Sequence, residues 1–120
     1  MRERHVLIEV KNLTAEYESG TVFLSGKAVP VAGQSRAGAE VIGCRVYHCW
    51  YKLSEPPCEG CPIEFAGYKQ IKKNVVEGEN FVCHFGIDGK KGIHLFEVRL
   101  LGQKGAMGPP SNRVKIIIKE

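Results

Sequence analysis

The fold of this chain is decided by a stretch near the C-terminus, which from Ile93 to Ile118 has the sequence IHLFEVRLLGQKGAMGPPSNRVKIII. Its first part, Ile93–Leu101, is rich in β-prone apolar residues, and its last part, Asn112–Ile118, has the same character. The intervening segment, Gly102–Pro110, holds three glycines and two prolines, which favour a loop. We therefore predict two β-strands joined by a long loop.

The same alternation of β-prone segments and turn residues continues through the rest of the chain. No window of about 11 residues has a helical period. Five further strands are predicted: Val6–Ser19, Thr21–Ser25, Val41–Leu53, Ile63–Ile71 and Phe81–Phe85. Lys72–Asn80 is polar and is predicted to be a connection. Seven short strands separated by turns predict an all-β chain.

Strand periodicity assigns the faces of the longest β-prone run, Val41–Leu53. Successive side chains of a strand point to opposite faces. The set predicted to face the core is Ile42, Cys44, Val46, His48 and Trp50. The opposite face then carries Arg45, Tyr47, Cys49 and Tyr51. By the same alternation, Val22 and Leu24 and the odd-numbered positions of Phe81–Phe85 are expected to be buried.

Length and composition indicate one soluble domain spanning residues 1–120. The chain has 17 Lys and Arg against 13 Asp and Glu, a formal charge of +4, and 43% of its residues are hydrophobic. A chain of this length buries about two thirds of its unfolded surface, so it needs no metal or disulfide to fold. No apolar run approaches the ~18–20 residues of a membrane span, and no Lys/Arg run is longer than two. We expect no membrane span, no export signal in this chain and no nucleic-acid partner.

Several segments, taken in order, resemble those of a fibronectin type III domain, a seven-stranded immunoglobulin-like β-sandwich. The segments similar to its first three strands are Asn12–Glu16, Thr21–Ser25 and Ile42–Tyr47, and those similar to its sixth strand, loop and seventh strand are Phe96–Leu100, Gly105 and Gly108–Val114. Cys44 stands where a tyrosine is usual, Gly26 where the core tryptophan is usual, and His94 where the tyrosine corner would have tyrosine. Trp50 is expected to compensate for the missing core tryptophan.

The resemblance implies a divergent, bacterial member of the family and a role without catalysis. We expect an extracytoplasmic interaction or spacer module, part of a bacterial envelope lipoprotein, whose partner is a protein or a cell-envelope component. Loops at the two ends of the sandwich would carry the binding, and no enzyme activity and no cofactor are implied. Lys115 and Lys119 on the last strand discourage edge pairing, so a monomer is expected.

Five cysteines are present, and Cys49, Cys58 and Cys61 are predicted to lie in or next to the same hairpin loop. We predict a structural disulfide, either within the Cys58–Cys61 pair or from one of them to Cys49, formed in an oxidising compartment. The alternative function is a small metal-binding or thiol protein, although these thiols supply only three of the four ligands that zinc requires. Free thiols in a reducing cytoplasm and a redox-active pair remain open alternatives.

The remaining cysteines and the histidines predict no catalytic set. Cys44 and Cys83 fall on apolar faces of two strands, which favours small buried side chains over a mutual bridge. The four histidines fall on four different predicted strands: His5, His48, His84 and His94. A lone histidine on a strand is more often a structural group than a general base, so no catalytic residue is predicted.

Overall fold

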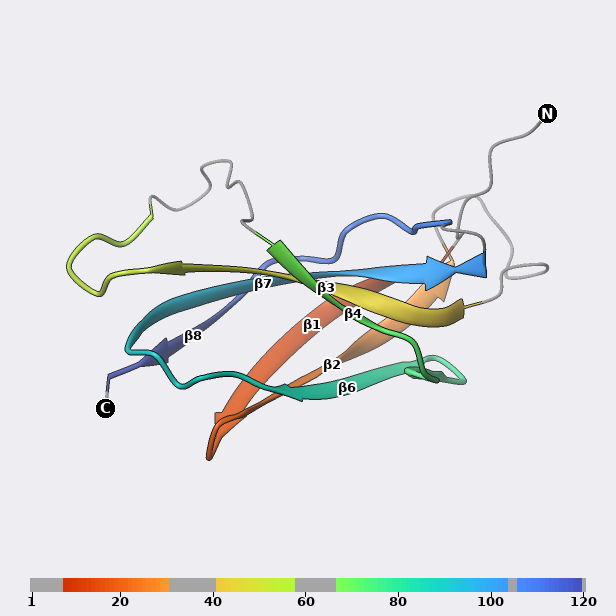
Figure 1. Ribbon diagram of the computed structural model, residues 1–120. Coiled ribbons are helices and arrows are strands. Elements are labelled where there is room, and N and C mark those ends of the chain that lie inside the picture. Colours follow the sequence, from red (N-terminus) through yellow and green to blue (C-terminus); the bar gives the residue numbers. More distant parts are fainter. Residues whose placement is uncertain (1–7, 31–40, 58–66, 104–105, 120) are drawn as a thin grey trace.

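The computed structural model describes residues 8–30, 41–57, 67–103 and 106–119 of the chain, and in this part it is all-β, as predicted. Eight strands are present: β1 (Ile8–Glu18), β2 (Thr21–Pro30), β3 (Val41–Tyr51), β4 (Gly67–Ile71), β5 (Val76–Glu77), β6 (Asn80–Gly86), β7 (Gly92–Gly102) and β8 (Val114–Ile118). They form two antiparallel sheets, ordered β1-β2-β6-β5 and β4-β3-β7-β8, which pack as a sandwich (Figure 1). That residues 1–120 make one domain, and that it is monomeric, stay predictions.

The strand that the sequence did not predict is β5, which lies in the predicted polar connection Lys72–Asn80. It has two residues, and Val76 and Glu77 pair with Phe81 and Asn80 at the beginning of β6. Two residues are too few to show a hydrophobic period. The predicted count of seven strands was therefore one too low.

The core lies between the two sheets and is built from alternate residues of the long strands. Val22 and Leu24 on β2 are fully buried, and so is the odd-numbered Phe81 on β6, as alternation predicts. The core residues are Ile8, Val10, Leu13, Val22, Leu24, Ala28, Cys44, Val46, Val75, Phe81, Cys83, Phe96, Val98, Leu100, Ile116 and Ile118. Every strand of both sheets except β4 and β5 contributes to this list, so the core joins the two layers along most of their length.

A β-bulge near the beginning of β3 changes which residues face the core. The register with β7 shifts between Val41 and Gly43. Val41 therefore packs against the core in the position predicted for Ile42, while Cys44 and Val46 are buried as predicted. A bulge opposes two residues to one and inverts the alternation on one side of it, which a strict period of two does not anticipate.

Trp50 lies at the opposite end of β3 and is not part of the core. Its indole Nε1 donates a hydrogen bond to the carbonyl oxygen of Lys91 at 2.8 Å. The ammonium of Lys90 lies 3.7 Å from the centroid of the Trp50 ring. Trp50 thus covers the loop between β6 and β7, and the prediction that it replaces a core tryptophan was wrong.

Close approach of β1 explains why Gly26 occupies the position of the missing tryptophan. β1 has its own bulge, between Lys11 and Thr14, where Asn12 has a φ of 57°. A Cβ placed on Gly26 would lie 3.0 Å from the carbonyl oxygen of Lys11 and 3.0 Å from Cγ1 of Val10. The bulge therefore fills the space in which a large side chain on β2 would lie.

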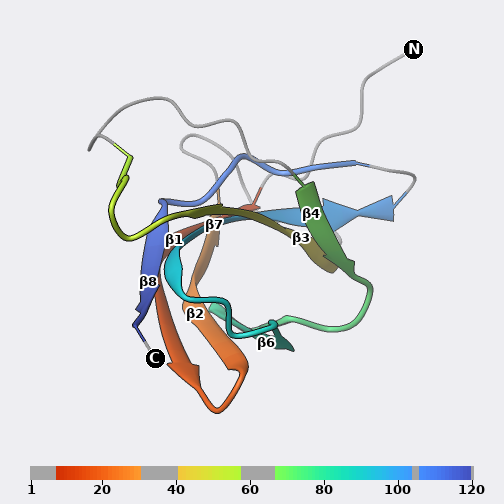
Figure 2. The same ribbon diagram turned by 60° about the vertical axis from the view of Figure 1, so that its left-hand side comes forward.

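One side of the sandwich is less covered by strands than the rest. β4 is the outermost strand of its sheet, and β5 is the outermost strand of the other sheet but covers only the beginning of β6. Figure 2 shows β4 and β6 on the same side of the molecule, joined by the connection that contains β5. Within the described residues, no helix is long and apolar enough to cross a membrane.

Candidate functional site

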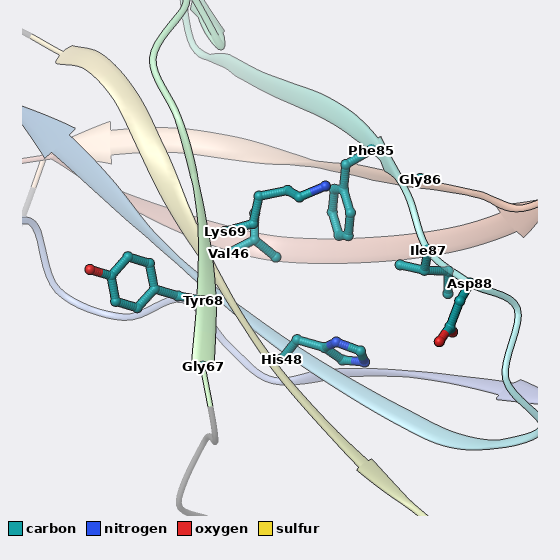
Figure 3. Close-up of a pocket in the computed structure, with 9 residues that line it drawn as sticks. All are labelled: Val46, His48, Gly67, Tyr68, Lys69, Phe85, Gly86, Ile87 and Asp88. Atoms are coloured by element: carbon teal, nitrogen blue, oxygen red, sulfur yellow. The ribbon is translucent and has the colours of Figure 1, made fainter.

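A groove of about 530 Å³ opens on this side of the sandwich, between β4 and the end of β6 (Figure 3). Three short segments from distant parts of the chain line it. They are Val46 and His48 of β3, Gly67, Tyr68 and Lys69 of β4, and Phe85, Gly86, Ile87 and Asp88 at the end of β6 and just beyond it. Among the described strands, none pairs with both β4 and the end of β6, so the gap between the two sheets is open here.

Strand pairing determines which β4 side chains face the groove. Val46 is opposite Lys69 in the register of β3 with β4, so Lys69 points to the same face as the buried Val46. The ammonium of Lys69 lies 5.6 Å from the centroid of the Phe85 ring. Tyr68 alternates to the outer face, and Figure 3 shows its ring turned away from the groove. The groove thus combines an apolar floor with a cation at its rim.

Two histidines form a hydrogen-bonded chain beside the groove. His48 Nε2 lies 2.9 Å from His94 Nδ1, and His94 Nε2 lies 2.7 Å from the carbonyl oxygen of Lys90. A carbonyl oxygen can only accept, so His94 donates from Nε2, and its Nδ1 accepts from His48 in the neutral state. His48 is therefore the Nε2–H tautomer, and its Nδ1 is left as an acceptor.

The surroundings of His48 oppose its protonation. The imidazole stacks on the ring of Phe96, with the ring centroids 4.7 Å apart. Burial lowers the pKa of His48 below its ordinary value, and the neighbouring His94 lowers it further, while the carboxylate of Asp88 acts in the opposite direction. In Figure 3 the imidazole of His48 and the carboxylate of Asp88 lie at the same end of the groove.

We expect the free energy of unfolding to fall as the pH is lowered from 7 towards 5. Below the ordinary histidine pKa of about 6.5, the unfolded chain takes up a proton that folded His48 resists, so protonation favours unfolding. Urea unfolding of His48→Gln should show a shallower pH dependence than the wild type. The control is His84→Gln, because His84 is exposed on the other sheet. Equal slopes in the wild type and His48→Gln would contradict the expectation.

The histidine pair corrects the interpretation that the four histidines are separate structural groups. In the pairing of β3 with β7, His48 is opposite Phe96 and His94 is opposite Trp50. The two histidines are therefore diagonal neighbours on the same face of the sheet. Among the described residues, neither imidazole is hydrogen-bonded to a serine, a threonine or a cysteine. The pair is therefore not combined with a nucleophile in the described part of the chain.

The predicted cysteine site is only partly within the described residues. Cys49 has a free thiol, and it is buried on the outer face of β3 against Ile93 and Leu95. Burial raises the pKa of this thiol. Cys58 and Cys61 lie outside the described residues, so the disulfide stays a prediction. No group of three His, Cys, Asp or Glu side chains that could hold a metal occurs in the described segments.

Cys44 and Cys83 are free, buried and in contact across the sandwich, as their predicted role of small buried side chains requires. The side chains of the two residues are hydrogen-bonded to one another. Because this hydrogen bond and burial both favour the protonated thiol, the pKa of Cys44 lies far above its ordinary value. This makes Cys44 a poor nucleophile.

Comparison with known proteins supports the fold alone. No protein-family model matches the chain, and no curated protein matches it. A solved structure described as "Myokine structure" is similar with a TM-score of 0.54 and 12% sequence identity, covering 93% of this chain and 96% of that chain. Domains A168–A170 of titin are similar with a TM-score of 0.47 and 16% identity, covering 92% of this chain and 32% of that chain.

The first likeness and the two antiparallel sheets agree with the predicted class of fold. The described part of the chain has the immunoglobulin-like β-sandwich fold that the sequence predicted, and membership of the fibronectin type III family stays a prediction.

Proposed function

We propose that this protein is a non-catalytic interaction module that binds an extended peptide segment of a protein partner along the groove beside β4. The observation that carries the proposal is that the 530 Å³ groove lies between two strand edges that are open in the described structure. A strand edge presents unpaired N–H and C=O groups to which an extended peptide can add as a further strand.

Backbone hydrogen bonds identify the open edge of β6. Ile87 N donates to the carbonyl oxygen of Gly20, on the β2 side, and Val82 N donates to that of Val75, on the β5 side. Because the N–H and C=O groups of a strand alternate between its two neighbours, His84 and Gly86 also direct theirs to the β5 side. β5 ends its pairing at Phe81, so within the described residues this part of β6 has an open edge next to the groove.

The groove also has a place for a side chain of such a peptide. Phe85 is half-buried, and together with Val46 it forms an apolar surface at the floor. In a bound strand every second side chain points to the same face, so one apolar side chain would contact this floor while the backbone pairs with a strand edge. Its burial would add a hydrophobic contribution to the main-chain hydrogen bonds.

The proposal includes an extracytoplasmic compartment and, as its narrowest form, a bacterial envelope lipoprotein that functions as a monomer. The resemblance of the sequence to fibronectin type III segments and the five cysteines in 120 residues support this context. The absence of a nucleophile beside the histidine pair in the described residues supports a role without catalysis.

A peptide selection on the purified protein tests the proposal. A phage-displayed library of random 12-residue peptides is panned on the protein, and the binders are mapped by the shifts of backbone amide signals in nuclear magnetic resonance. We expect binders whose shifts concentrate on β4 and on Cys83–Gly86. Selected peptides that perturb only the end loops, or failure to select any binder, would overturn the proposal.

A blocking substitution makes the test specific to the groove. Gly67 lines the groove, and a Cβ at this position would meet no atom within 4 Å, so Gly67→Trp adds bulk without a collision at its base. We expect Gly67→Trp to weaken binding by about tenfold or more, since it occupies the path of the peptide. The matched control is Lys115→Trp, on an exposed position of β8, which should bind as the wild type does.

A further inference from the structure

We propose that the outer face of the β4-β3-β7-β8 sheet is a second binding surface, which takes a protein segment carrying two neighbouring carboxylates. The surface, here the arginine–tyrosine face, consists of Arg45, Tyr47, Tyr68 and Arg99. Arg45, Tyr47 and Arg99 do not line the groove, and Tyr68, which borders it, turns its ring to the outer face (Figure 3). The inference rests on two arginines that lie side by side and have no acidic partner among the described residues.

The two arginines are directly opposite one another on adjacent antiparallel strands. The register of β3 with β7 pairs Arg45 with Arg99. Val46 and Val98, the next pair along, are both buried in the core, so both arginines point outward. Side chains at opposite positions have Cβ atoms about 4.5–5.5 Å apart, and like charges placed there are destabilising. The fold therefore accepts a repulsion at this position.

Each guanidinium is held in place by a neutral group. Arg45 Nε donates to Gln70 Oε1 at 2.8 Å, and its Cζ lies 4.3 Å from the centroid of the Tyr68 ring. Arg99 Nε donates to the carbonyl oxygen of Gly108 at 2.7 Å. Both hydrogen bonds use Nε, so the two terminal NH₂ groups of each guanidinium can donate to another acceptor. The planar arrangement of these N–H groups matches the two oxygens of a carboxylate.

Glu97, the acidic residue of this face within the described segments, is already paired with a third arginine. Glu97 Oε2 lies 3.5 Å from Arg113 Nε, in an ion pair. Among the described residues, neither Arg45 nor Arg99 takes part in an ion pair. The charge of the arginine pair is therefore not neutralised within the described part of the chain, and a ligand with two carboxylates is complementary to it.

The aromatic residues favour a protein as the source of these carboxylates. The rings of Tyr47 and Tyr68 contact one another, with the centroids 5.4 Å apart, and Tyr68 is 52% exposed. Tyrosine and arginine are the residue types that, with tryptophan, dominate binding energy in protein–protein interfaces. A polyanion such as a nucleic acid is bound by long basic stripes, whereas this chain has a formal charge of only +4.

An acidic peptide of defined sequence tests the proposal. The probe is an end-capped 12-residue peptide that alternates glutamate with alanine, and its glutamine version is the reference. Isothermal titration calorimetry on the wild-type protein should give binding of the glutamate peptide that weakens between 50 and 300 mM NaCl, because screening reduces the charge attraction. Equal binding of the glutamine peptide, or no binding of the glutamate peptide, would overturn the proposal.

Two double variants with the same loss of charge locate the binding. We expect Arg45→Gln/Arg99→Gln to weaken binding by about tenfold or more. The control is Lys11→Gln/Lys27→Gln, which removes two cations that are also opposite one another, but on β1 and β2 of the other sheet. The control should change the affinity by less than about twofold, because its charges lie on the other face of the sandwich. An equal loss in both variants would show that only the net charge matters and would overturn the proposal.

A charge-conserving variant keeps the result interpretable if the glutamine variant is less stable. Arg45→Lys/Arg99→Lys retains both charges but loses the planar fork, so we expect an affinity between those of the wild type and the glutamine variant. Tighter binding of a sulfated oligosaccharide than of the glutamate peptide at equal charge would identify a general polyanion site and contradict the proposal. Gly67→Trp, which blocks the groove, should bind the glutamate peptide as the wild type does. The two proposals can therefore fail independently of one another.

Discussion

Replacing Phe96 by alanine is expected to lower the free energy of unfolding by about 3–5 kcal/mol, the range for a large aromatic side chain removed from a core. Phe96 is fully buried. Its ring contacts Phe85 edge to face, with the centroids 5.7 Å apart, and stacks on His48. The side chain therefore joins the core to two residues of the groove, and its loss leaves a cavity that neighbouring strands can fill only in part.

Urea denaturation followed by intrinsic fluorescence measures this change, with Phe23→Ala as the matched control. Phe23 is the same residue type but is 42% exposed on the outer face of β2, where its ring contacts His84. Removal of this partly exposed ring should cost less than about 1 kcal/mol. If the two alanine variants had similar unfolding midpoints, the assignment of Phe96 to the core would be wrong.

The second large effect is expected at Gly92, the first residue of β7. Its φ is 141°, a backbone conformation that other residues rarely adopt. A Cβ here would lie 2.2 Å from Trp50 Nε1 and 2.6 Å from the carbonyl oxygen of Tyr51. Gly92→Ala therefore combines backbone strain with a collision against β3, and we expect a loss of about 3–5 kcal/mol or failure to fold.

Gly78→Ala separates the two causes, because Gly78 shares the positive φ but not the collision. Its φ is 63°, and a Cβ at this position would meet no atom within 4 Å. The expected loss is only about 1 kcal/mol, from backbone strain alone. Thermal unfolding monitored by circular dichroism compares the two variants directly. A Gly92→Ala protein as stable as Gly78→Ala would contradict the close contact between Trp50 and the beginning of β7.

The fold class could be predicted because the longer strands each carry a signal in their own sequence. Buried residues recur at every second position, as Val22 and Leu24 do on β2 and Phe81 and Cys83 on β6. This period of two predicts a strand with one buried face. Such a period can be recognised in a single sequence because it follows from the local geometry of the strand backbone. The prediction failed where a period is too short or interrupted, as at the two residues of β5 and at the bulge of β3.

The groove could not be predicted from the chain, because no local pattern marks it. His48 and Lys69 are brought together by the pairing of β3 with β4, whereas Phe85 and Asp88 come from the other sheet and the loop after it. Their proximity depends on how the two sheets pack against one another, which is a property of the assembled sheets. The hydrogen bond between His48 and His94 likewise needs the register of β3 with β7, which the spacing of the two histidines in the sequence does not reveal.

The sequence by itself determined that this protein is an all-β sandwich with Cys44 and Cys83 buried, since burial in a strand follows from alternation along the backbone. Only the tertiary structure decided that Arg45 faces Arg99 and that a groove opens between β4 and β6. The physical reason is that contacts between strands depend on register and on strand ends. A shift of one residue in pairing changes every cross-strand neighbour and reverses the face of every side chain, yet leaves the composition and the hydrophobic pattern of the chain unaltered.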